Sequence, residues 1–114
     1  MNDLIASSNI LNIYGAIQNE RRRQEDLKRS GKFDFTCASL NVLTTAKLAV
    51  LAEEFGEVSK EVVEQLIETQ KYAKENMVYP KNRKEYRKAE LRKELVQVAA
   101  VCVAWLESLE NDNE

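Results

Sequence analysis

The chain has 114 residues, 44% of them hydrophobic and 32% charged, and its formal net charge is −2 at pH 7. This length predicts one domain over residues 1–114, and this composition excludes a disordered chain. The weakly negative charge argues against a nucleic-acid polymer as partner, because proteins that bind such polymers are usually clearly basic. No apolar run approaches the roughly 18 residues needed to cross a membrane, and the start Met1-Asn2-Asp3 lacks the pattern of a signal peptide, so we expect a cytoplasmic protein without membrane contact.

Three segments show the apolar periodicity of helices. The first helix ends at Ser30-Gly31, and a loop over residues 30–40 follows, carrying Phe33 and Phe35. Pro80 separates the second helix from the third, because proline disfavours a helical residue before it. The expected helices run over Leu4–Arg29, Leu40–Glu75 and Lys81–Leu109.

The second and third helices each span roughly 30 residues, about 45 Å at 1.5 Å per residue. Helices of this length usually pair with those of a second copy to complete a four-helix core. We therefore predict an all-α fold of long antiparallel helices, forming a four-helix bundle completed by oligomerisation. A homodimer and a tetramer built from dimers both satisfy this prediction.

Carboxylates gather on one face of the second helix. Glu54 and Glu57 lie three positions apart and Glu53 and Glu57 four apart, so each pair shares a face. Like charges at this spacing repel by about a few tenths of a kcal/mol per pair. Because the chain contains no histidine, metal sites and catalysis based on histidine are excluded, and any chemistry must use carboxylates, lysine, arginine or a bound metal.

An antiparallel hairpin that turns at residues 76–80 brings these glutamates opposite the third helix. Three carboxylates facing one another are unfavourable unless a cation or protons neutralise them, and hard oxygen ligands suit Mg²⁺ or Mn²⁺. A solvated acidic surface is the alternative interpretation. The pairs expected across the hairpin are Glu54–Gln97, Glu57–Glu94, Glu64–Arg87 and Glu68–Arg83.

The motifs Glu53-Glu54-x-x-Glu57 and Glu94-x-x-Gln97 resemble the EExxE and ExxD pattern of MazG-like, all-α nucleoside triphosphate pyrophosphohydrolases. The surrounding segments are similar to a phage- and cassette-type subgroup, and the resemblance covers residues 10 to 109. It implies an enzyme that uses Mg²⁺, or Mn²⁺ in its place, to hydrolyse a (deoxy)nucleoside triphosphate to the monophosphate and pyrophosphate. The implied role is house-cleaning of the nucleotide pool.

The resemblance also implies roles for the motif residues. Glu54, Glu57 and Glu94 would ligate the metal, and Glu53 would activate the attacking water or help to hold a second ion. Gln97 stands where the wider family has Asp, and we group it with the metal ligands as a variation of the subtype. Its neutral amide either lowers the metal count or affinity, or contacts substrate or water instead.

Cations supply further candidates for substrate binding. Arg83 and Arg87 would clamp phosphate, since arginine binds it in a bidentate way, or they would pair with Glu68 and Glu64. Lys47, two turns before the first motif, is a second phosphate candidate.

Aromatic and basic residues of the first helix and its loop leave alternatives open. Phe33 and Phe35 would either stack on a base or cover the end of the bundle. Most of the run Arg21-Arg22-Arg23 is expected to be solvated, because its members point in different directions around the helix. Trp105 is expected in the core or at a subunit interface.

Two other functions compete with the hydrolase. A non-catalytic helical-bundle interaction protein would need the acidic stripe only for pairing with basic residues, and would tolerate Glu57→Gln. A third interpretation keeps the family chemistry and changes the substrate to another phosphoanhydride.

Overall fold

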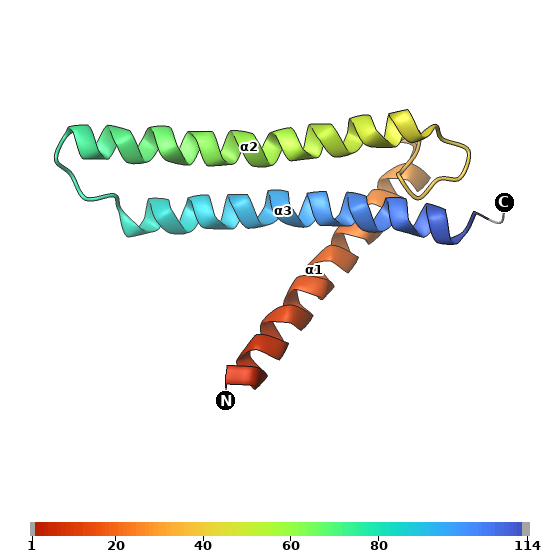
Figure 1. Cartoon of the computed structure of the whole chain (residues 1–114), viewed down its shortest axis with the longest axis horizontal. Helices are drawn as coiled ribbons and strands as arrows, with labels where there is room; N and C mark the ends of the chain where they lie inside the picture. Colours follow the sequence, from red (N-terminus) through yellow and green to blue (C-terminus); the bar gives the residue numbers. More distant parts are fainter. Residues whose placement is uncertain (1, 113–114) are drawn as a thin grey trace.

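The computed structural model describes residues 2–112, with side chains from residue 7 onward. Its three helices are α1 (Asn2–Arg29), α2 (Thr44–Lys74) and α3 (Lys81–Glu110), and the described part of the chain contains no strand. Helices α2 and α3 form an antiparallel hairpin, while α1 crosses α3 obliquely near the open end of the hairpin and projects away from it (Figure 1). The all-helical prediction is confirmed.

Local backbone chemistry explains where the helices end. Gly31 and Asn76 both have a positive φ, 84° and 54°, which glycine and asparagine tolerate best. Each of the two residues follows the last turn of a helix. After α2, the N–H of Met77 donates a hydrogen bond to the carbonyl of Tyr72 at 2.9 Å. The turn between α2 and α3 therefore falls where the sequence predicts it.

Helix α2 begins four residues later than expected, at Thr44 instead of Leu40. The backbone N–H of Thr36 donates to the Ser39 hydroxyl at 3.2 Å, and the Ser39 N–H donates to the Thr36 carbonyl at 3.0 Å. Short polar side chains that bond to nearby backbone compete with helix formation. They hold residues 36–39 in a turn, and the loop extends to Leu43.

The predicted register of the hairpin is confirmed by its ion pairs. Arg83 donates to Glu68 at 2.7 Å, and Arg87 donates to Glu68 at 2.8 Å and to Glu64 at 3.0 Å. Tyr79 adds a hydrogen bond to Glu68 at 3.1 Å. These contacts hold α2 and α3 together in the half of the hairpin next to its turn, and α1 crosses α3 near the other end (Figure 1).

The small buried core lies at the end of the hairpin that α1 crosses. Cys37 of the loop packs there with Val101 and Ala104 of α3, and Ala104 is completely buried. Trp105 packs against this cluster while remaining partly exposed. The core is therefore built mainly from small side chains of the loop and α3.

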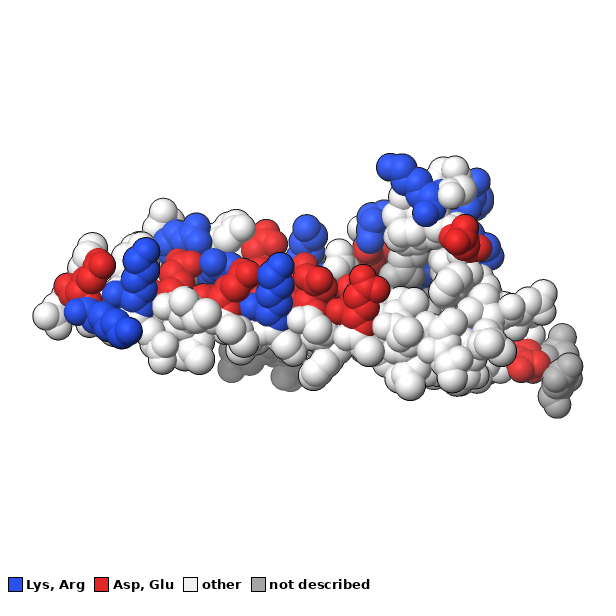
Figure 2. Space-filling view, turned by 90° about the horizontal axis from the view of Figure 1, so that it is seen from above, with Lys and Arg blue, Asp and Glu red and all other residues white. Residues whose placement is uncertain are grey.

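Large apolar side chains of α2 lie on the opposite face from its glutamates, and α3 does not cover them. Several of these side chains, such as Phe55, are exposed in the single chain. Figure 2 shows charged side chains along one side of the hairpin and an uncharged strip along the other. The exposed apolar residues at helical spacing on α2 are Leu48 (55%), Phe55 (64%), Val62 (50%) and Leu66 (56%).

None of the helices in the described part of the chain is long and apolar enough to cross a membrane.

Candidate functional site

A pocket of about 380 Å³ opens where α1, the loop and the hairpin meet. This volume lies within the range of small-molecule sites. Each element contributes one part of the wall: Glu20, Arg23 and Gln24 from α1; residues 32–37 from the loop; Val50, Glu53 and Glu54 from α2; Gln97 and Val101 from α3.

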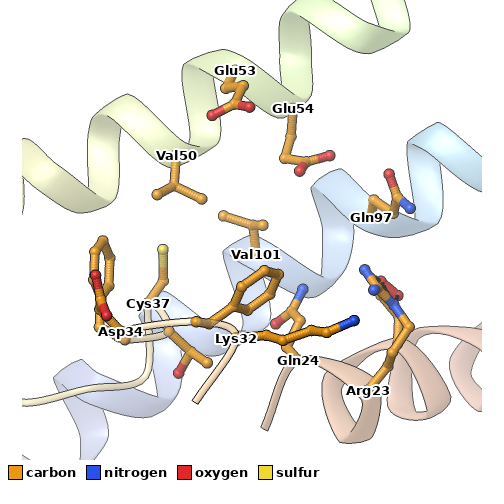
Figure 3. Close-up of a pocket in the computed structure, with 14 residues that line it drawn as sticks. Arg23, Gln24, Lys32, Asp34, Cys37, Val50, Glu53, Glu54, Gln97 and Val101 are labelled. Carbon is orange, nitrogen blue, oxygen red and sulfur yellow. Dashed lines mark hydrogen bonds and ion pairs between the residues drawn. The ribbon is translucent and has the colours of Figure 1, made fainter. Parts of the chain in front are cut away.

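One wall of the pocket is acidic. The side chains of Glu53 and Glu54 come from adjacent positions of α2 and face the hollow (Figure 3). Burial raises the pKa of Glu54, and the negative charges of Glu94, Glu53 and Glu20 raise it further. Glu20, on α1, is an acidic neighbour that the sequence motifs do not contain. Carboxylates from all three helices therefore share one electrostatic environment.

Gln97 lies between two of these carboxylates. With its amide oriented so that the nitrogen faces them, it donates to Glu54 Oε2 at 3.2 Å and to Glu94 Oε2 at 2.9 Å. The opposite orientation would turn the amide oxygen toward negative charge. With its nitrogen facing them, the Gln97 amide partly compensates the negative charge of the two carboxylates. The closeness of Glu54 and Gln97 also confirms their predicted pairing across the hairpin.

Glu57 and Glu94, the remaining motif carboxylates, lie beside the pocket and do not line it. Burial raises the pKa of Glu94, and the charge of Glu57 raises it further, as expected if these two side chains face each other across the hairpin. Within residues 7–112, no group of three Asp, Glu or Cys side chains is placed to hold a metal ion as it stands. The donors nevertheless fit Mg²⁺ in kind, because they are hard carboxylate oxygens whose negative charges lie close together.

Two cations face the acidic wall across the pocket. The amine of Lys32 and the guanidinium of Arg23 lie on the same side of the hollow, opposite Glu53 and Glu54 (Figure 3). Arg23 donates two hydrogen bonds to Glu20, at 2.7 and 2.8 Å, and these bonds raise its pKa. The sequence did not single out either cation, because it does not show how the loop folds back over α1.

Arg21 is buried, whereas Arg22 and Arg23 are exposed, so the prediction that most of this run is solvated is confirmed. Arg21 donates to Glu107 of α3 at 2.6 Å and to Gln24 at 2.8 Å, and Glu25 accepts at 2.9 Å. Glu25 also accepts from the Thr36 hydroxyl at 2.8 Å. This network fixes the loop against α1 and α3 beneath the pocket.

The loop also supplies the apolar end of the pocket. Phe33 and Phe35 both line the hollow, together with Cys37, Val50 and Val101. Phe33 remains 40% exposed, so part of its ring faces solvent. The structure thus brings together the two predicted aromatic residues and two glutamates of the first acidic motif, Glu53 and Glu54. Stacking on a base stays a prediction.

The other substrate candidates lie elsewhere. Arg83 and Arg87 bind Glu68 near the turn, and this pairing is the alternative that the sequence offered for them. Lys47 is 5% exposed and is not among the residues that line the pocket. The cations that line the pocket with the acidic wall are therefore Arg23 and Lys32, and not the three candidates from the sequence.

No family model matches the chain, and neither a curated protein nor a solved structure matches it. The resemblance to MazG-like enzymes therefore rests on the sequence motifs and the segments around them, and the family membership stays a prediction.

Proposed function

We propose that this chain is a MazG-like, Mg²⁺-dependent enzyme that hydrolyses (deoxy)nucleoside triphosphates to the monophosphate and pyrophosphate, as house-cleaning of the nucleotide pool. The observation that carries the proposal is the pocket in which Glu53 and Glu54 face Arg23 and Lys32 beside two phenylalanines. Cations would neutralise the charge of a triphosphate, and an apolar surface would bind the base. Carboxylates would hold the metal ion and accept a proton from the attacking water.

The reaction assigns a task to each motif residue. Glu54, Glu57 and Glu94 would hold the metal ion, with the carbonyl oxygen of Gln97 available after its amide turns away from the carboxylates. Bound Mg²⁺, or Mn²⁺ in its place, would screen phosphate charge and acidify a water molecule. Glu53 would accept the proton of that water while the water oxygen bonds to the α-phosphorus. The bond from the α-phosphorus to the bridging oxygen breaks, and pyrophosphate leaves with its electron pair.

The pocket favours one orientation of the nucleotide. Phe33 and Phe35 lie at the loop end, where a base would stack without strong preference for its identity. Arg23 and Lys32 lie across the pocket from the carboxylates and would contact the phosphates. This orientation places the α-phosphate beside Glu54.

We also propose that the enzyme works as a homo-oligomer, a dimer or a tetramer built from dimers, with a four-helix core. The apolar strip of Leu48, Phe55, Val62 and Leu66 runs along α2 on the face opposite α3. A continuous exposed strip of this kind marks an interface in a folded protein. Since α2 and α3 bury mainly charged pairs between them near the turn, a second hairpin would supply the missing apolar contacts.

A non-catalytic interaction protein is the competing function. The exposed apolar residues favour it, because they would equally dock a different helical partner. Such a protein would not need Glu53 and Glu54 beside a pocket. A hydrolase acting on another phosphoanhydride would need them, and it differs from our proposal only in its substrate.

The test is to incubate the protein with each dNTP and NTP and Mg²⁺, and to identify the products. The proposal expects monophosphate and pyrophosphate in equal amounts, with no turnover in EDTA. Release of orthophosphate would contradict the assigned bond cleavage. Absence of turnover with both Mg²⁺ and Mn²⁺ would favour the interaction protein, and turnover of non-nucleotide substrates alone would favour the third interpretation.

A further inference from the structure

A second hollow, of about 650 Å³, lies between α1 and α3 directly beside the pocket. The two hollows share three lining residues, Glu20, Arg23 and Gln97. Arg23 extends from α1 toward Gln97 of α3 at this junction (Figure 3). The two hollows therefore adjoin at these three residues, while the acidic wall and the phenylalanines line only the first pocket.

The second hollow is positively charged. Arg92 and Lys93 of α3 line it in addition to Arg23, and among its described lining residues Glu20 is the one acid. Glu20 is already bonded to Arg23. Neither Arg92 nor Lys93 forms an ion pair within the described part of the chain, whereas Arg83 and Arg87 of the same helix are both paired with Glu68. Two cations that form no ion pair among the described residues thus line a concave surface next to the proposed reaction centre.

We propose that this hollow is the diphosphate subsite, where Arg92 and Lys93 bind the β- and γ-phosphates of the substrate and then the pyrophosphate product. The proposal rests on the proposed function for the identity of the complete ligand. A base between the phenylalanines and an α-phosphate beside Glu54 leave the rest of the triphosphate pointing across Gln97 into the hollow. Arginine and lysine are the side chains that compensate such charge.

This assignment predicts which ligands the site distinguishes. Ligands with two linked phosphates beyond the α-position use the subsite, whereas a nucleoside monophosphate does not reach it. Inorganic pyrophosphate alone carries the recognised group, so it serves as a probe that does not require turnover.

The experiment is calorimetric titration of inorganic pyrophosphate into the full chain, as wild type and as the double variant Arg92→Ala/Lys93→Ala. The matched control is Lys84→Ala/Lys88→Ala, which removes two exposed cations of α3 outside the hollow. We expect the first variant to weaken pyrophosphate binding by about tenfold or more, because a charge-assisted hydrogen bond is worth roughly that factor. The control should retain wild-type affinity, and binding of a nucleoside monophosphate should be equal in all three proteins.

Equal loss in both double variants would overturn the subsite, since it would show a general effect of net charge. Undetectable pyrophosphate binding by the wild type would overturn it as well. Failure of the proposed function is a separate result: binding that depends on Arg92 and Lys93 without hydrolysis of any triphosphate keeps the anion subsite and refutes the enzyme.

Discussion

Position 97 sets the charge of the site through a single side chain. Its amide donates to Glu54 and Glu94, and burial and neighbouring negative charge raise the pKa of both carboxyls. An aspartate at this position would replace two favourable hydrogen bonds with a further negative charge. Gln97 therefore stabilises the metal-free protein. A neutral amide, however, offers a bound cation less negative charge than an aspartate would.

Gln97→Asp is expected to lower the stability of the metal-free protein by about 1–3 kcal/mol, through the lost hydrogen bonds and added repulsion. The same change should tighten Mg²⁺ binding, because an additional carboxylate faces the ion. Thermal unfolding with and without Mg²⁺ measures both effects. Gln70→Asp, at an exposed position of α2, is the control. Unchanged stability of both variants in EDTA would contradict the role given to the amide.

The α2–α3 hairpin is fastened at its turn by a compact ionic network centred on Glu68. Hydrogen bonds from Arg83 and Arg87 lower the pKa of Glu68 to about 2, from an ordinary value of 4.5. A carboxyl whose pKa is lower in the folded state binds protons more readily when unfolded. Its contribution to stability is therefore complete above pH 4.5 and is lost as the pH falls through 4.5 toward 2.

Glu68→Gln should accordingly be less stable than the wild type at pH 7, and the difference should narrow as the pH falls from 4.5 toward 2. Urea unfolding midpoints at a series of pH values measure this difference. Glu75→Gln alters an exposed carboxylate at the end of α2 and should follow the wild type throughout. A difference in unfolding midpoint between Glu68→Gln and the wild type that stays constant down to pH 2 would show that the ion pairs do not cause the loss of stability.

The sequence predicts the helices and their register because these features depend on local periodicity and on complementary charges. Glu64 and Glu68 meet Arg87 and Arg83 as the spacing requires. The pocket depends instead on how the loop folds over α1, which involves the bonds of Thr36 to Glu25 and of Arg21 to Glu107. No repeat or spacing in the chain encodes these contacts, so the first acidic motif was identified while Arg23 and Lys32 were not.

In the whole molecule, the single chain encloses charged side chains and exposes large apolar ones, which is the reverse of the usual pattern. Charged pairs lie between α2 and α3, and large apolar side chains such as Phe55 face outward. Periodicity identified these apolar positions correctly as a helix face, but it could not show what covers them. The proposed second copy resolves this conflict between sequence pattern and single-chain exposure.

Phe55→Glu is therefore expected to separate the oligomer into monomers, since it places a charge in the middle of the apolar strip. Light scattering coupled to gel filtration measures the mass of each species. Val78→Glu is the control, because Val78 is 90% exposed in the turn and lies off the strip. A monomeric wild type at high micromolar concentration would refute self-association.

The most direct test of the account is the turnover of a nucleoside triphosphate by Glu54→Gln beside Glu64→Gln. Both substitutions neutralise a half-buried glutamate of α2, but only Glu54 lines the pocket. We predict that Glu54→Gln loses about a hundredfold or more in kcat, the size expected for removing a group that stabilises charge at a reaction centre, while Glu64→Gln stays close to the wild type. Equal turnover by the two variants would contradict the placement of the reaction in this pocket.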